Sequence, residues 1–222
     1  MKIQDIELKW WGHSSFSIKY KNKISYIDPF QLSSSEKADI IFITHSHYDH
    51  CSLQDIEKIA KDGTTIVCTA DSQSKINRIN KKIEIILVEP NKEIDIKDIK
   101  VRTIPAYNNS KPFHSKSEYW VGYLIQFGDT LVYHAGDTDF IKEMQEISKQ
   151  LAGKYSIALL PIGGTYIMNV DEAVKAAVAI NASLSIPMHY GSVPDTGTKS
   201  NAEKFVNLCG EKGLNAQIME KS

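Results

Sequence analysis

The segment from Ile40 to His50 reads IIFITHSHYDH, and it decides how the rest of the chain is interpreted. Its first five residues, Ile40–Thr44, form an apolar run that is typical of a β-strand buried on both faces. Four potential metal ligands follow, namely His45, His47, Asp49 and His50. A solvated polar loop would explain a lone histidine, but it does not explain this density directly after a buried strand. Imidazole and carboxylate are ligands that zinc and other divalent metals prefer, so the segment predicts a metal site at a strand end.

The spacing within this segment predicts two ions. Residues two apart on an extended backbone face the same side, so we expect His45 and His47 to reach one ion. A turn would then direct Asp49 and His50 toward a second ion. Other apolar runs also end at a potential ligand, namely LVYHAGD at Asp137 and LSIPMH at His189. Because functional groups gather in loops held by strand ends, we expect all these residues to converge on one site.

Alternating apolar and polar residues, which are typical of half-buried antiparallel strands, open each half of the chain. In the first half, IELKWW and FSIKYKNKISYID predict a meander with a turn at Lys21 and Asn22. In the second half, residues 81–104, WVGYLIQF and TLVYHA alternate in the same way, and Gly128 with Asp129 suits a two-residue hairpin turn. Each half therefore predicts one sheet.

Helical spacing follows each set of strands, in residues 52–62, 140–151 and 171–180 and again after Ser200. The expected helix signals are N-caps at Ser52 and Asn169, a capping box formed by Ser200 and Glu203, and a stop at Gly63. No repeat or Ser/Gly/Pro-rich linker divides the sequence, so we expect a single domain over residues 1–222. Two mixed sheets packed on each other, with helices on their outer faces, expose the fewest apolar faces. We therefore expect an α/β fold with a four-layer αββα sandwich.

The composition excludes several classes of protein. With 26 Lys and Arg against 27 Asp and Glu, the formal net charge is -1, which argues against a polybasic nucleic-acid binder. The sequence lacks the roughly 20 consecutive apolar residues of a membrane span. Its three cysteines, Cys51, Cys68 and Cys209, lie outside any CxxC pattern, so neither a disulfide framework nor a zinc ribbon is expected. These features favour a cytoplasmic protein without membrane contact.

The histidine-rich segment resembles the metallo-β-lactamase superfamily, whose signature H-x-H-x-D-H is present as HSHYDH. The resemblance covers nearly the whole chain, and WWGHSSFSI followed by YIDPF looks like the opening of the simple metal-dependent hydrolases, including the ascorbate-6-phosphate lactonase-like proteins. It implies the αββα fold and two divalent metal ions, zinc first, with manganese or iron as alternatives. YHAGDTD looks like the segment with the bridging aspartate, and IPMHYG like the segment with the last ligand. The implied ligands are His45 and His47 for one ion, Asp49, His50 and His189 for the other, and Asp137 between them.

One ligand of the first ion is left open by the resemblance. The superfamily usually places a further histidine between the signature loop and the bridging aspartate. The candidates are His114, in KPFHSKSEYW, and Asn108, in PAYNNS. We favour His114, because imidazole is a better ligand for zinc-like metals than a neutral amide oxygen. The alternative is that His114 is an exposed loop residue.

Four further residues have supporting roles or none. Asp28, in YIDPF, resembles a position that supports the metal loop by accepting an imidazole N–H, although a turn role is equally compatible. His13 either lines the cleft or satisfies a loop hydrogen bond, and we favour the second. His134 is expected to be structural or to support the ligands. Cys51 is expected to fill a small buried space, with metal binding as the alternative.

The resemblance and the ligand set together predict a metal-dependent hydrolase that acts on a compact ester, lactone or phosphoester. Two ions can hold a bridging water whose pKa falls from about 16 toward about 7, so no protein nucleophile is needed. Asp49 is placed to orient this nucleophile or to carry its proton. Lys111 and Lys116 flank His114 and hint at an anionic substrate.

Two other functions remain as alternatives. The first is a phosphodiesterase acting on a small, cyclic nucleotide; the neutral charge and the length of 222 residues argue against a long nucleic acid. The second is a non-catalytic metal-binding protein, which is disfavoured because a structural zinc is closed by four protein ligands, whereas this set leaves positions for water. The expected partner is a small molecule, and the oligomeric state is not indicated.

Overall fold

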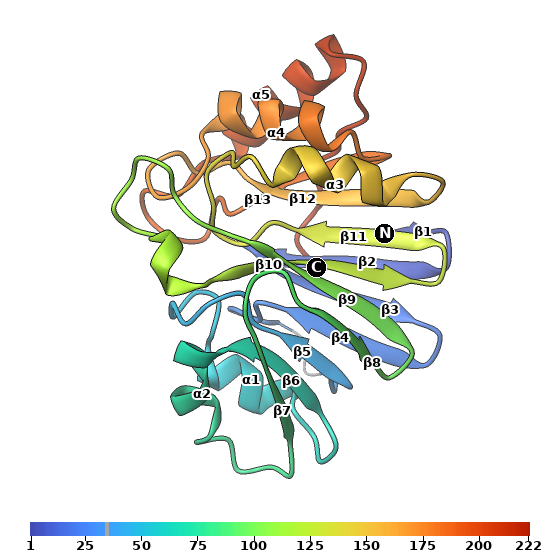
Figure 1. The fold of residues 1–222 in the computed structure, drawn as a ribbon, viewed down its shortest axis with the longest axis vertical. Helices are drawn as coiled ribbons and strands as arrows, with labels where there is room; N and C mark the ends of the chain where they lie inside the picture. The colour runs from blue at the N-terminus through green and yellow to red at the C-terminus, as the bar shows by residue number, and fades with distance from the viewer. Residues whose placement is uncertain (34–35) are drawn as a thin grey trace. The chain divides into compact units, whose positions relative to one another are not determined.

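The computed structural model describes residues 1–33 and 36–222. The chain divides into two compact units: Met1–Glu89 together with Glu220–Ser222, and Pro90–Met219. Each unit holds one mixed sheet and its own helices, which confirms the α/β class with two mixed sheets (Figure 1). A single domain over residues 1–222 stays a prediction. Among the helices of the described residues, none is long and apolar enough to cross a bilayer.

The sheet of the first unit contains seven strands in sequence order. They are β1 (Lys2–Ile3), β2 (Ile6–Gly12), β3 (Ser15–Tyr20), β4 (Lys23–Ile27), β5 (Ile40–Phe42), β6 (Thr65–Thr69) and β7 (Glu84–Val88). The strands β1–β4 form the expected antiparallel meander, and Tyr20 pairs with Lys23 across the predicted turn. From β4 to β7 the strands are parallel. The three residues of β5 are fully buried, as the apolar run predicts.

Two short helices belong to this unit, α1 (Leu53–Ile59) and α2 (Ala70–Ile76). Ser52 caps α1 as predicted, since its hydroxyl accepts a hydrogen bond from the backbone N–H of Asp55. The helix ends at Ile59, earlier than expected, and Gly63 lies in the following turn. Helix α2 was not predicted. Both helices contribute to a core cluster with the strands, including Ile56, Ile59 and Ile76.

The sheet of the second unit has six strands in the order β13-β12-β11-β10-β9-β8. They are β8 (Glu93–Ile96), β9 (Ile99–Pro105), β10 (Val121–Phe127), β11 (Thr130–His134), β12 (Tyr155–Pro161) and β13 (Leu184–Met188). Phe127 pairs with Thr130, which confirms the hairpin turn at Gly128 and Asp129. The loop between β9 and β10 contains one 3-10 turn, Lys116–Glu118.

Three helices pack together beside β12 and β13 (Figure 1): α3 (Met144–Leu151), α4 (Val170–Ile180) and α5 (Lys199–Glu211). Asn169 caps α4 as predicted, in a capping box with Glu172. The predicted start of α5 is wrong. Its capping box is formed by Thr198 and Asn201, so the helix begins before the predicted cap at Ser200. The start of α3 also lies later than expected.

The strand directions bring the loops of each unit to one edge of its sheet. In the first sheet, β2 and β4–β7 run the same way, because β3 is antiparallel to both β2 and β4. In the second sheet, β9 and β11–β13 run the same way, because β10 is antiparallel to β9 and β11. The loops that follow these strands carry every residue proposed as a ligand.

Candidate functional site

The first unit places several histidine and aspartate side chains at the carboxyl ends of its strands. His13 follows β2, and the segment from His45 to His50 follows β5. Functional groups in open sheets typically gather at this edge. The side-chain amine of Lys75, on α2, donates to the backbone oxygen of Ser46, which holds this segment against the helix.

Asp28, which follows β4, is fully buried and organises the ligand segment. Its Oδ1 accepts from the backbone N–H of Thr44 (2.8 Å), and its Oδ2 accepts from the Thr44 hydroxyl (2.7 Å). Oδ2 also lies 2.7 Å from His50 Nδ1. A carboxylate only accepts hydrogen bonds, so Nδ1 of His50 carries the proton and Nε2 carries the lone pair. Asp28 thus accepts an imidazole N–H, and its role in supporting a metal loop stays a prediction.

The same carboxylate acts on His45 through Thr44. The single hydroxyl proton of Thr44 points to Asp28, so its oxygen accepts from His45 Nδ1, 2.9 Å away. Nε2 of His45 therefore carries the lone pair as well. Two histidines of the signature thus have the tautomer that binds metal through Nε2.

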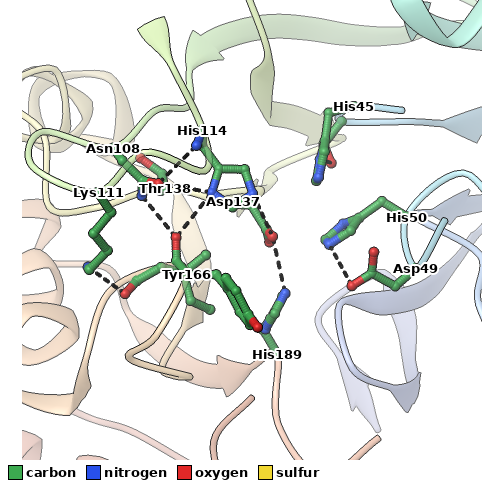
Figure 2. Close-up of polar contacts among 12 residues, drawn as sticks. His45, Asp49, His50, Asn108, Lys111, His114, Asp137, Thr138, Tyr166 and His189 are labelled. Carbon is green, nitrogen blue, oxygen red and sulfur yellow. Dashed lines mark hydrogen bonds and ion pairs between the residues drawn. The ribbon is translucent and has the colours of Figure 1, made fainter. Parts of the chain in front are cut away.

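The remaining residues of this segment lie close to these two. The ring centroids of His45 and His47 are 4.6 Å apart, and those of His45 and His50 are 4.2 Å apart. Asp49 Oδ2 lies 3.8 Å from His50 Nε2 (Figure 2). The first unit therefore gathers all four ligands that the signature predicts.

His13 belongs to this group, although the sequence analysis favoured a loop hydrogen bond for it. Its Nε2 lies 3.0 Å from Asp49 Oδ2, and its ligand atom is within 4.8 Å of those of Asp49 and His50. The signal that would have found it is strand direction. In a meander, alternate strands end at the same edge, so the loop after β2 returns to the edge where β4 ends.

The second unit gathers the other three predicted ligands, which are all buried. Asp137 follows β11, His189 follows β13, and His114 lies in the loop between β9 and β10. Asp137 Oδ2 is 3.3 Å from His114 Nε2 and 3.1 Å from His189 Nε2. The exposed-loop alternative for His114 is wrong, because only 1% of its surface is exposed.

Asn108 lies beside His114, and its carboxamide is hydrogen-bonded within the protein. Its amide nitrogen donates to Asp139 Oδ1 (3.1 Å) and to the backbone oxygen of Tyr166 (3.0 Å). Its amide oxygen accepts from the backbone N–H of His114 (3.0 Å). The carboxamide is thus committed to the protein, which favours His114 as the ligand.

Three of these residues adopt a strained backbone. His13, Asp28 and His189 have φ values of 51°, 46° and 61°, in the left-handed region that residues with a Cβ rarely occupy. Each directly follows the end of a strand at the edge described above. Such strain persists where the surrounding structure enforces it, and it is concentrated at functional sites.

Two residues near the ligands are structural, as expected. Nδ1 of His134 accepts from the backbone N–H of Gly136 (3.2 Å), which shapes the turn before Asp137. Cys51 lies in the core cluster, and burial raises the pKa of its thiol to about 11.

Lys111 and Lys116 are both paired with carboxylates. Lys111 Nζ lies 2.5 Å from Asp139 Oδ1, and Lys116 Nζ lies 3.2 Å from Glu143 Oε1. Lys116 also lies over the ring of Tyr107, 4.4 Å from its centroid. The positive charges that hinted at an anionic substrate are therefore largely neutralised within the protein.

The donor sets of both units fit a divalent first-row metal, because they consist of imidazole nitrogens and carboxylate oxygens. In addition, His45, His50 and His114 turn Nδ1 toward a hydroxyl, a carboxylate and a carbonyl oxygen respectively. Metal-binding histidines almost always donate their other N–H to such partners.

Comparisons with known proteins agree with this chemistry. Residues 7–189 match the sequence model of the beta-lactamase superfamily domain. The chain is 32% identical over 220 residues to a UPF0173 metal-dependent hydrolase of Nanoarchaeum equitans, covering 97% of both proteins. It is 34% identical over 221 residues to another from Pyrococcus horikoshii, covering 93% of both.

Solved structures give the same result. A candidate metal-dependent hydrolase from Parabacteroides distasonis matches with a TM-score of 0.83 and 27% identity, over 98% of this chain and 94% of the other. Igni18, a metallo hydrolase from Ignicoccus hospitalis, matches with a TM-score of 0.79 and 25% identity, over 98% and 96%. The narrower resemblance to ascorbate-6-phosphate lactonase-like proteins stays a prediction. The chain belongs to the beta-lactamase superfamily, a family of enzymes, and is related over nearly its whole length to the UPF0173 metal-dependent hydrolases.

Proposed function

We propose that the protein is a hydrolase that uses two divalent metal ions, zinc in the first place, to cleave a compact ester, lactone or phosphoester. The observation that carries the proposal is the set of imidazoles and carboxylates at the strand ends, in which hydrogen bonds direct Nε2 of three histidines to act as ligands. The names of the two relatives described above, both metal-dependent hydrolases, support the same class of reaction.

We assign the ligands as the sequence predicts. His45, His47 and His114 are proposed for one ion, and Asp49, His50 and His189 for the other. Asp137 is proposed to bridge the ions, and its geometry supports this role. One oxygen of Asp137 lies 3.3 Å from His114 and 3.1 Å from His189, which are assigned to different ions.

When bound, the ions supply Lewis acidity and lower the pKa of a water from about 16 toward about 7. Asp49 is proposed to orient the nucleophilic water and to accept its proton. His13 holds the Asp49 carboxylate from the side, through the contact of 3.0 Å between Nε2 and Oδ2. This contact limits the rotation of the carboxylate. A group that orients a water molecule needs such a fixed position.

The surroundings of the ligands favour a substrate with an apolar part. Tyr48 and Phe113, which are 63% and 44% exposed, each precede a proposed ligand directly in the sequence. The ring of Phe113 packs edge-on against Tyr166, with centroids 4.7 Å apart. The pairing of Lys111 and Lys116 with carboxylates gives an anionic preference little support.

The test combines metal analysis with a substrate panel. The purified protein is stripped with a chelator, reconstituted with Zn²⁺, Mn²⁺ or Fe²⁺, and assayed on p-nitrophenyl esters, a lactone series, p-nitrophenyl phosphate and bis-p-nitrophenyl phosphate. We expect two bound ions and turnover of at least one ester, lactone or phosphoester that is lost on stripping. Asp49→Ala should lose this turnover, whereas Lys149→Ala, which removes an exposed ion pair with Glu146 on α3, should retain bound metal and turnover. A protein that binds no metal, or turns over nothing after reconstitution, would contradict the proposal.

A further inference from the structure

We propose that Asn108 is a positioning residue: its carboxamide, held by Asp139 and Lys111, acts with the backbone oxygen of Tyr166 to orient the ring of His114 and fix its tautomer, so that Nε2 is the atom that binds metal. The inference rests on the proposed function, because it concerns a ligand of the proposed metal site. It gives Asn108 a role other than the ligand role that the sequence left open.

The orientation of the carboxamide follows from its neighbours. The amide nitrogen of Asn108 lies 3.1 Å from Asp139 Oδ1 and 3.0 Å from the backbone oxygen of Tyr166. Both neighbours are acceptors, so the NH₂ group must face them, and a flipped amide would place oxygen against oxygen. Oδ1 then faces His114 and accepts its backbone N–H at 3.0 Å.

The tautomer of His114 follows from this orientation. Nδ1 of His114 lies 3.1 Å from Asn108 Oδ1 and 3.1 Å from the backbone oxygen of Tyr166 (Figure 2). Both are acceptors, so Nδ1 carries the proton. A neutral imidazole has one N–H, so the lone pair is on Nε2, the atom beside Asp137.

Asp139 and Lys111 hold the carboxamide in place. Asp139 is 3% exposed, and its carboxylate accepts from the amide of Asn108, from the backbone N–H of Asn109 (2.9 Å) and from Lys111 Nζ (2.5 Å). Lys111 also donates to the backbone oxygen of Ile167 (2.7 Å). A buried carboxylate is costly unless it is paired, so Lys111 stabilises the acceptor that orients Asn108. Asp139 is close in sequence to Asp137, but it acts on His114 indirectly, by holding the carboxamide of Asn108.

The network also closes the loop that carries His114. The backbone N–H of Asn108 donates to the backbone oxygen of His114 at 2.7 Å, while the backbone N–H of His114 donates to the side chain of Asn108. The members of the network come from the loops after β9, β11 and β12. The position of the His114 ring is thus set by three loops at the same sheet edge.

The proposal is tested by zinc affinity, measured by competition with a chromogenic chelator on the full chain. We expect Asn108→Ala and Asn108→Asp to weaken binding of one zinc ion by about 10-fold to 100-fold, the usual effect of removing a partner that orients a ligand. Asn108→Asp acts by placing a second carboxylate against Asp139, in place of the amide nitrogen that now donates to it.

A double variant, Asn108→Asp/Asp139→Asn, exchanges donor and acceptor and conserves the net charge. The amide introduced at the Asp139 position can donate to the carboxylate introduced at the Asn108 position, while its oxygen still accepts from the backbone N–H of Asn109. The exchange does not restore the bond from Lys111 to Asp139 Oδ1 or the bond from Asn108 to the backbone oxygen of Tyr166. Because the repulsion between two carboxylates is removed, we expect the double variant to recover part of the affinity that Asn108→Asp loses.

The matched control is Asn109→Ala. The side chain of Asn109 donates to the backbone oxygen of Phe140 (2.9 Å), so this variant removes a bond from the same loop without touching His114. We expect its zinc affinity to equal that of the wild type. Melting temperatures of the stripped proteins show whether a variant is merely less stable. Wild-type affinity in Asn108→Ala overturns the proposal.

A measurement on the unaltered protein tests the tautomer itself if these variants fail to fold. In the zinc-loaded wild type, ¹⁵N spectra of the histidine rings should show a proton on Nδ1 of His114 and metal on Nε2. The opposite tautomer would overturn the inference while leaving the proposed function intact. If the wild type binds no zinc, both the inference and the proposed function fail.

Discussion

Asp28 controls the protonation of two histidines, although it contacts only one of them. It accepts directly from His50, and through the hydroxyl of Thr44 it directs the proton of His45. All of these residues are buried, so competition from water for the hydrogen bonds is limited. One carboxylate thus prepares two metal ligands, and its loss should affect both.

The variant Asp28→Asn tests this arrangement. An asparagine cannot accept from Thr44 and His50 as a carboxylate does, so we expect zinc affinity to fall by about 10-fold to 100-fold. Chelator competition measures the change. Asp55→Asn is the matched control, because Asp55 is a buried carboxylate of the same unit that accepts from the backbone N–H groups of Gln31 and Leu32. The control should lose stability but keep its zinc affinity; equal losses of affinity in both variants would refute the role of Asp28.

Asp137 and His114 should differ in how much metal each one holds. A bridging carboxylate serves two ions, so Asp137→Ala is expected to lower occupancy of both, whereas His114→Ala is expected to lower mainly one. Elemental analysis of the dialysed proteins measures both. Wild-type metal content in His114→Ala would move the ligand assignment to Asn108.

At the level of single residues, the sequence indicates which candidate ligands gather at the strand ends better than it indicates the residues that orient them. The signature His45–His50 stands out because of its density and its place after a strand. The role of Asn108 was not visible, because its partners Asp139 and Tyr166 lie 31 and 58 residues away. The sequence analysis favoured a loop hydrogen bond for His13, because a single histidine in a loop forms no local pattern that would indicate a site.

Among the elements, β10 shows how tightly a strand is fitted beside the ligands. A Cβ added to Gly122 would lie 2.6 Å from the backbone oxygen of His134 and 2.7 Å from that of Ala135. These are backbone atoms at the end of β11, just before Asp137, so they cannot rotate away. A side chain at this position must displace the strand end that carries the proposed bridging ligand.

We therefore expect Gly122→Ala to lower the free energy of unfolding by about 1–3 kcal/mol, as overpacking does, and to reduce bound zinc. Urea unfolding and elemental analysis measure the two effects. Gly210→Ala is the control, because nothing lies within 4 Å of a Cβ there and Gly210 is inside α5. It should be neutral or stabilising by up to about 1 kcal/mol. A Gly122→Ala protein as stable as the wild type would contradict the prediction, because it would mean that the end of β11 moves aside without cost.

The sequence predicts which segments are strands or helices better than it predicts where each element starts and ends. Alternation and apolar runs indicated the strands because burial on one or both faces imposes a period on the sequence. Helix starts were less certain, since several capping residues can stand close together: Thr198 and Ser200 both suit the start of α5, and the bond to Asn201 selects Thr198. Helix α2 has only 7 residues, too few for a clear helical period.

For the molecule as a whole, the buried cysteines predict a loss of stability at alkaline pH. Burial raises the pKa of Cys68 to about 12 and that of Cys209 to about 11, from 9.0. As the pH rises above 9.0, the unfolded chain loses thiol protons that the folded protein keeps, so the free energy of unfolding falls. Below pH 9.0 both thiols are protonated in the folded and the unfolded state, so their contribution to the free energy of unfolding is fully present. Urea unfolding across the range should show a steeper decline for the wild type than for Cys68→Ala/Cys209→Ala; identical slopes would contradict this.

The first unit is built from two separate stretches of the chain, and this limits how the protein can be dissected. Its last residues, Glu220–Ser222, return to it after the whole second unit, and the backbone N–H of Ser222 donates to the backbone oxygen of Trp10. A gene fragment that stops at Glu89 would therefore encode this unit without its final piece. Replacement of residues 90–219 by a short linker peptide, which keeps Glu220–Ser222, is the more suitable design for producing the first unit by itself.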